Sequence, residues 1–154
     1  MEREKIDQFD ARIRRELQQD ASQSQRELAD KVGLSQNACW RRLRALEDRG
    51  IIRGRTLRLD RAKLGLGLVV FVMVKTRHHS AAWLETFRQH VSSIPEVVDF
   101  FRIGGDYDYM LRIVTTDMAS FDSVYQRLIQ KVELESVTSY FAMEAIEERR
   151  PLPI

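Results

Sequence analysis

The sequence predicts an α+β protein of two domains, a helical domain over residues 1–60 and a βαββαβ domain over residues 61–154. Two observations lead to this division. Up to Gly50 the apolar residues recur at the spacing of amphipathic helices, whereas from Leu66 they form strand-length runs that alternate with two further helical patterns. A polar turn at Asp60–Gly65 lies between the two regions, and we place the domain boundary there.

The composition is that of an ordinary globular protein, with 154 residues of which 44% are hydrophobic and 31% charged. The N-terminus is charged from Glu2 onward, which is not a signal-peptide pattern. No apolar run reaches the roughly 20 residues of a membrane helix. The single cysteine, Cys39, excludes an internal disulfide. We therefore predict a cytoplasmic protein without a membrane partner, in which Cys39 is a small buried residue rather than a redox sensor.

The central motif of the helical domain is a pair of helices joined by a tight turn. Ser24 and Glu27 form a capping box at the start of the first helix, and Gly33 permits the sharp turn at its end. Ser35 is a natural N-cap for the second helix, which Gly50 would end. The apolar stripe of this second helix is Cys39, Leu43 and Leu46.

Two further segments complete this domain. An earlier helix supplies a third wall through the stripe Ile6, Phe9, Ile13 and Leu17, with Asp10 on the stripe either at its edge or next to a partner. Residues 51–60 alternate like a short strand and carry Arg53, Arg55 and Arg58. This strand is either a wing that touches the DNA backbone or a connector to the second domain.

The outer face of the second helix carries side chains suited to reading DNA. Asn37, Arg41 and Arg44 lie opposite Cys39. Arginine pairs with guanine and asparagine or glutamine with adenine, while other arginines hold phosphates. An ordinary solvated helix face is the alternative, but two helices joined at a glycine turn together with a basic outer face favour a helix-turn-helix. The candidate DNA-binding residues are Ser35, Gln36, Asn37, Trp40, Arg41, Arg42, Arg44 and Arg53.

The second domain reads as a ferredoxin-like βαββαβ unit. Strands are expected at residues 66–74, 97–103, 107–114 and 137–146, with helices around Trp83–Val91 and, after an Asp117 cap, Met118–Val132. Two helices cover only one face of a four-stranded sheet. The other face would remain open, and we predict that it forms a two-fold symmetric dimer. The residues expected on this open face are Val69, Phe71, Met73, Phe100 and Met110.

Several strings together resemble the Lrp/AsnC family of bacterial transcription regulators. They are VGLSQNACWRRLRALEDRGII from Val32, PEV from Pro95, GDYDYMLRIV from Gly105 and the closing LPI. The resemblance implies an N-terminal winged helix-turn-helix and a C-terminal ligand-sensing domain. It also implies homodimers that assemble further into octamers on double-stranded DNA, and a free amino acid bound near the GDYDY loop.

Carried onto this chain, the effector site is the loop before the third strand and the start of the last strand. Glycines allow backbone amides to approach a carboxylate closely, and Asp106 or Asp108 is suited to an ammonium group. Thr138 or Ser139 is suited to hydrogen-bond the ligand. A simple hairpin turn is the alternative. The candidate effector-binding residues are Gly104, Gly105, Asp106, Tyr107, Asp108, Ser136, Thr138 and Ser139.

His78 and His79 stand before Ser80 and Trp83 in an HHS-x-x-W pattern. This pattern is similar to a branch of the family that responds to cysteine. Metal binding is a poorer interpretation, because adjacent residues of a strand point to opposite faces. The simplest interpretation is that both histidines are exposed to solvent and bind nothing.

These observations predict a sequence-specific DNA-binding transcription regulator whose DNA binding or assembly responds to a small amino acid, with cysteine as a candidate. We see no glycine-rich phosphate loop, no His-x-x-x-His pair and no nucleophile next to a base, and we therefore predict no enzyme activity, no catalytic residues, no metal and no cofactor. The alternatives are an amino-acid-binding assembly protein without DNA specificity, or a small ferredoxin-like enzyme.

Overall fold

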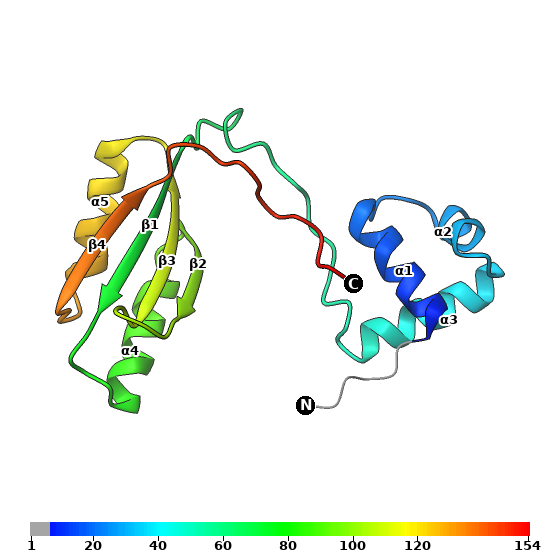
Figure 1. Cartoon of the computed structure of the whole chain (residues 1–154), viewed down its shortest axis with the longest axis horizontal. Helices are drawn as coiled ribbons and strands as arrows, with labels where there is room; N and C mark the ends of the chain where they lie inside the picture. Colours follow the sequence, from blue (N-terminus) through cyan, green and yellow to red (C-terminus); the bar gives the residue numbers. More distant parts are fainter. Residues whose placement is uncertain (1–6) are drawn as a thin grey trace. The chain divides into compact units, whose positions relative to one another are not determined.

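The computed structural model describes residues 7–154 and consists of two compact units (Figure 1). One unit contains the residues up to Arg58 together with Glu147–Ile154, and the other contains Leu59–Ile146. Ile6, expected on the first apolar stripe, lies outside the described residues. None of the helices within residues 7–154 has the length and apolarity that crossing a membrane requires.

The helical unit is built from α1 (Gln8–Gln19), α2 (Gln25–Val32) and α3 (Gln36–Asp48). Each helix turns its apolar stripe inward, as the spacing predicts. Cys39 is buried, and burial raises the pKa of its thiol, which keeps it protonated. The buried core consists of Ile13, Leu28, Ala29, Val32, Cys39, Leu43 and Leu46.

The helix ends follow the predicted capping chemistry. Ser24 N–H donates to the Glu27 carboxylate at 2.7 Å and Glu27 N–H donates to Ser24 Oγ at 3.2 Å, which confirms the capping box. Gly33 turns the chain with a φ of 75°. Gly50 does the same after α3 with a φ of 68°, and Ile51 N–H donates to the Leu46 carbonyl. These caps fix the start of α2, its end at the tight turn toward α3, and the end of α3.

Residues 51–60 form no strand, and that prediction is wrong. The four strands of the described chain all belong to the second unit, so the segment has no neighbouring strand to accept its hydrogen bonds. An alternating sequence pattern does not by itself make a β-strand when no neighbouring strand pairs with it. Leu57 and Leu59 are exposed here. The expected wing strand is therefore absent from the described part of the helical unit.

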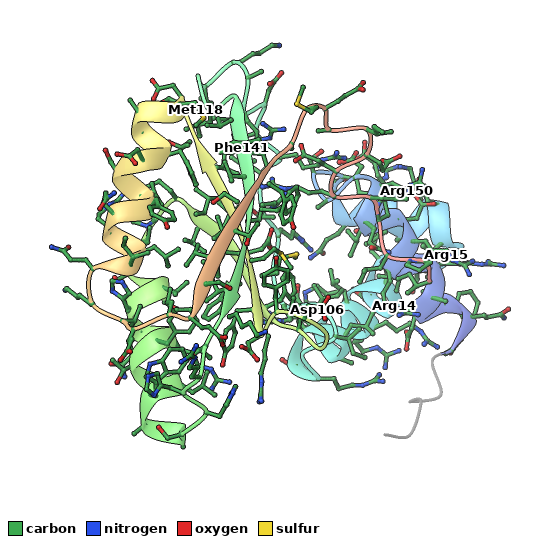
Figure 2. The ribbon with its side chains drawn as sticks, turned by 60° about the vertical axis from the view of Figure 1, so that its left-hand side comes forward. Arg14, Arg15, Asp106, Met118, Phe141 and Arg150 are labelled. Carbon is green, nitrogen blue, oxygen red and sulfur yellow. The ribbon has the colours of Figure 1, made fainter. Side chains whose placement is uncertain are left out.

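The last eight residues lie on the helical unit, although the division made from the sequence counted them with the second domain. Gln18 of α1 accepts from Leu152 N–H at 2.7 Å and donates to the Leu152 carbonyl at 3.4 Å. Arg15 Nε donates to the Ile154 carbonyl at 2.8 Å (Figure 2). The chain thus reaches the helical unit twice, once before the sheet and once after it.

The second unit is a four-stranded antiparallel sheet with two helices on one side (Figure 1). The strand order β2-β3-β1-β4 confirms the ferredoxin-like arrangement. The last strand ends at Phe141 instead of continuing to Ile146. The elements are β1 (Leu68–Lys75), α4 (Ala81–Ser92), β2 (Val97–Arg102), β3 (Tyr109–Thr115), α5 (Met118–Ile129) and β4 (Ser136–Phe141).

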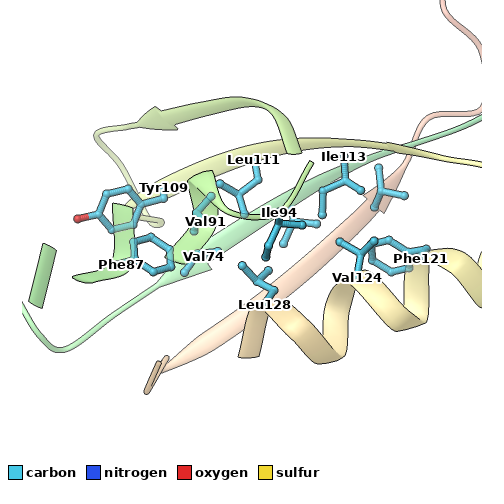
Figure 3. Close-up of a cluster of buried hydrophobic side chains, with 12 residues drawn as sticks. Val74, Phe87, Val91, Ile94, Tyr109, Leu111, Ile113, Phe121, Val124 and Leu128 are labelled. Atoms are coloured by element: carbon cyan, nitrogen blue, oxygen red, sulfur yellow. The ribbon is translucent and has the colours of Figure 1, made fainter. Parts of the chain in front are cut away.

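The core of this unit lies between the sheet and the two helices (Figure 3). Phe87 of α4 is its largest fully buried side chain. Phe100 also packs here, with its ring edge-on to Phe87 at 5.5 Å, so its predicted place on the open face is wrong. The reason is a bulge in β2 between Val97 and Asp99, which inserts one residue and reverses the alternation beyond it.

The other face of the sheet carries apolar side chains that neither helix covers. Phe71 and Met73 of β1 alternate with the buried valines of that strand, and Met73 lies opposite Met110. Phe101 and Tyr140 are half exposed, at 51% and 53%. We call Phe71, Met73, Phe101, Met110 and Tyr140 the open sheet face.

Candidate DNA interface and effector loop

The candidate recognition surface lies on the outer side of α3. Asn37 and Arg41 are exposed there, and the opposite side of the same helix is buried in the core. Gln36 is exposed in the first turn, while the Ser35 hydroxyl already accepts from Ala38 N–H at 3.3 Å. The backbone amides of this first turn and its polar side chains are the groups with which a helix N-terminus meets DNA.

Arg44 is held in an ordered but accessible position on the same surface. Its guanidinium lies over the Trp40 ring at 6.0 Å and 3.3 Å from the Glu47 carboxylate. Glu47 also lies 3.9 Å from Arg55. Ion pairs this exposed are weak, so Arg44 is able to exchange Glu47 for a base or phosphate at little cost. Glu47, whose carboxylate lies beside both Arg44 and Arg55, was not singled out from the sequence.

Arg42 differs from the other candidates because its guanidinium pairs within the unit. It lies 2.9 Å from Asp10 and 2.8 Å from Asp7 at the N-terminus of α1, over the Phe9 ring. Asp10 is buried on the apolar stripe of α1, where a carboxylate needs a partner. That partner is Arg42. The hydrogen bond from the Phe9 backbone N–H lowers the pKa of Asp7, and the hydrogen bond from Arg42 lowers it further. Arg42 therefore ties α3 to α1 rather than facing outward. Arg53 is exposed in the irregular segment after α3.

The candidate effector loop is the turn between β2 and β3. Ile103 N–H donates to the Asp108 carbonyl at 2.8 Å, which closes the loop at its base. Gly105 has a φ of 134°, a conformation that favours glycine. Asp106 is exposed at the tip (Figure 2), and Asp108 at the base accepts from Thr76 N–H through its carboxylate.

The loop also contacts the start of β4. Tyr107 donates its hydroxyl to Thr138 Oγ1 at 3.3 Å, and hydrogen bonds with Thr138 and Tyr140 lower the pKa of Tyr107. Ser136 lies opposite Lys75 in the register, on the same face as Thr138. Ser139 lies opposite the buried Val72, on the helix-covered face. The structure thus brings Thr138 to the loop and leaves Ser139 on the other side of the sheet.

Both histidines stand near this end of the sheet, at the start of α4. The His78 ring stacks on Trp83 at 6.1 Å, and its Nε2 lies 3.4 Å from the Glu133 carboxylate. His79 is exposed. Within residues 7–154, no three His, Cys, Asp or Glu side chains gather in a way that suits a metal ion.

Two family models together match most of the chain. Residues 69–152 match the Lrp/AsnC ligand binding domain, and residues 6–53 match a winged helix-turn-helix DNA-binding domain. The DNA-binding transcriptional activator DecR of Escherichia coli (strain K12) is 45% identical over 150 residues, which cover 97% of this chain and 99% of DecR.

Two solved structures are similar over nearly the whole chain. An AsnC family transcriptional regulator from Agrobacterium tumefaciens has a TM-score of 0.93 and 45% identity, covering 96% of this chain and 97% of that chain. A transcriptional regulator from Neisseria meningitidis, solved as a complex with L-Met, has a TM-score of 0.90 and 32% identity, covering 96% of both chains.

Proposed function

The chain belongs to the Lrp/AsnC family, as a helix-turn-helix transcription regulator with an amino-acid-binding domain, and from this premise we propose how it recognises DNA and its effector. Asn37, Arg41 and Arg44 read base edges in the major groove, and Gln36 and Arg53 contact the backbone. The observation that carries this proposal is the outer face of α3, where Asn37, Arg41 and Arg44 are exposed on a helix whose other side is core. Arg42 has the separate task of holding α3 on α1.

Two copies related by a dyad would present two such helices to successive major grooves, about 34 Å apart. Selection of binding sites from a pool of random duplexes is therefore expected to enrich a palindrome with half-sites about one helical turn apart. Recovery of random sequences would contradict specific recognition. That outcome would favour the alternative of an amino-acid-binding assembly protein without DNA specificity.

We propose that the dimer forms through the open sheet face and assembles further toward an octamer. Exposed apolar surface of this kind is a common site of self-association. The helices cover the other side of the sheet, so a second copy is the natural partner for Phe71, Phe101 and Tyr140. The basic surface of one copy is modest, and a dimer would bring two such surfaces to the DNA together.

Phe101→Glu is expected to convert the dimer to a monomer, because it places a charge on the proposed apolar interface, on the edge strand β2 and opposite Met110. Sedimentation velocity at micromolar concentration measures the change. Met118→Glu is the matched control, since Met118 is similarly exposed, at 57%, but begins α5 on the other side of the sheet. A wild-type protein that sediments as a monomer, or equal effects of the two variants, would contradict the proposal.

We also propose that the effector is a free α-amino acid that binds at the loop Gly104–Tyr107. The effector response requires that the amino acid bind one DNA-binding or assembly state more tightly than another, with a typical coupling of about 1–3 kcal/mol. Cysteine is one candidate, from the HHS-x-x-W pattern, and methionine is another, because the Neisseria meningitidis regulator was solved with L-Met. The relatives are regulators rather than enzymes, and we expect the protein to act in the cytoplasm.

A further inference from the structure

The open side of the sheet carries an ion pair among its apolar side chains. Arg112 lies on the inner strand β3, and Asp99 lies opposite it on the edge strand β2. We propose that Asp99 enables this face to close on a second copy of the chain, because its carboxylate neutralises the Arg112 guanidinium that closure removes from water. This role rests on the sheet-face dimer proposed above and identifies the residue on which closure of that dimer depends.

The strand register places the pair in one row with two aromatic side chains. Asp99 of β2 lies opposite Arg112 of β3. Arg112 in turn lies opposite Phe71 of β1, which lies opposite Tyr140 of β4. Leu111, the next residue along β3, is buried in the core between the sheet and the helices, so Arg112 faces the other way. The row therefore crosses all four strands on the side that α4 and α5 leave open (Figure 1).

The two charges of this row are held close together. Arg112 Nε lies 2.5 Å from Asp99 Oδ2. The Arg112 side chain is only 17% exposed in a single copy of the chain, and the Asp99 side chain is 36% exposed. A second copy that packs on Phe71, directly beside Arg112, would remove the remaining contact between the guanidinium and water.

Removing this guanidinium from water is costly unless a carboxylate accompanies it. A buried charge without a partner is strongly unfavourable, whereas a closely paired charge is tolerated. Arginine is accordingly common near the centres of protein interfaces, where it is paired. Phe71 and Met110 supply apolar contact area between the copies, and Asp99 offsets the penalty that Arg112 imposes. Loss of the Asp99 charge should therefore weaken the dimer even though no apolar contact is lost.

Sedimentation equilibrium over a dilution series of the full-length protein measures this role as the dissociation constant of the dimer. Asp99→Asn keeps the size of the side chain but removes its charge. It is expected to raise the dissociation constant at least about thirtyfold, the usual loss when a buried charge loses its partner. Asp99→Leu combined with Arg112→Met removes both charges and is expected to dimerise at least as tightly as the wild type. Circular dichroism verifies that each variant is folded.

Glu96→Gln provides the comparison with an ion pair elsewhere in the same unit. Glu96 also lies 2.5 Å from an arginine, Arg127, but Arg127 belongs to α5 on the covered side of the sheet. Its dimer dissociation constant is expected to stay within about threefold of wild type. Equal weakening by Glu96→Gln and Asp99→Asn would overturn the proposal, because the effect would then not depend on the open side of the sheet.

Two results for the Asp99 variants would also overturn the proposal while leaving the dimer itself in place. If Asp99→Asn stayed within about threefold of wild type, Arg112 would remain hydrated in the dimer. If the double variant dimerised as weakly as Asp99→Asn, the carboxylate would have a role other than neutralising Arg112. A wild-type protein that is monomeric at micromolar concentration would instead refute the sheet-face dimer, and the role of Asp99 with it.

Discussion

Replacing Arg41 and Arg44 together with alanine is expected to weaken binding to the selected DNA site by about 2–6 kcal/mol, or roughly thirtyfold to twenty-thousandfold. Each arginine is expected to contribute the usual 1–3 kcal/mol or so of a base-reading side chain. Both residues are exposed on α3, so the substitutions remove no core contact. Fluorescence anisotropy at fixed salt measures the affinity, and circular dichroism verifies that the helices remain.

Arg88→Ala is the matched control, because Arg88 is an exposed helical arginine on α4 of the other unit. Its affinity for the selected site should equal that of wild type. Arg42→Ala is no substitute for this control, since it leaves the buried Asp10 without its partner and weakens the helical unit itself. Unchanged affinity in the double variant would show that α3 does not read the DNA.

Most of the helices and strands were predictable because capping, turns and apolar spacing each depend on residues close in sequence. The capping box at Ser24, the glycine turn at Gly33 and the Asp117 cap each depend on residues close in sequence. The linker strand failed because pairing with another strand is a property of the whole fold. Phe100 was misplaced because a bulge in β2 leaves no clear signal in the residues that form it.

The candidate site was predictable in outline only. The stripe of α3 fixes which side chains face outward, so Asn37, Arg41 and Arg44 follow from spacing. Arg42 is paired through a contact with α1 more than thirty residues away, between Arg42 Nη1 and Asp10 Oδ1. Thr76 and Asp108 are likewise joined only in the folded sheet. Contacts of this range depend on strand order and register, which periodicity does not report.

Phe87→Ala is expected to destabilise the sheet unit by about 3–5 kcal/mol, the usual range for a buried phenylalanine. Phe87 is fully buried, stacks on Trp83 at 4.9 Å and lies 5.0 Å from the Tyr109 ring. Deleting its ring removes the contact that joins α4 to β2 and β3. Since domains are commonly stable by about 5–15 kcal/mol, the loss is a large share of the total.

Urea unfolding followed by Trp83 fluorescence measures this loss in a Trp40→Phe background, which leaves one tryptophan in the sheet unit. Leu64→Ala is the control, because Leu64 is exposed and should change the unfolding free energy by less than about 0.5 kcal/mol. Each unit has its own core. When Trp83 is replaced instead, Trp40 reports on the helical unit, and Phe87→Ala should leave the midpoint of that unfolding transition at its wild-type value. A shift of both transitions by the same amount would mean that the two units unfold as one.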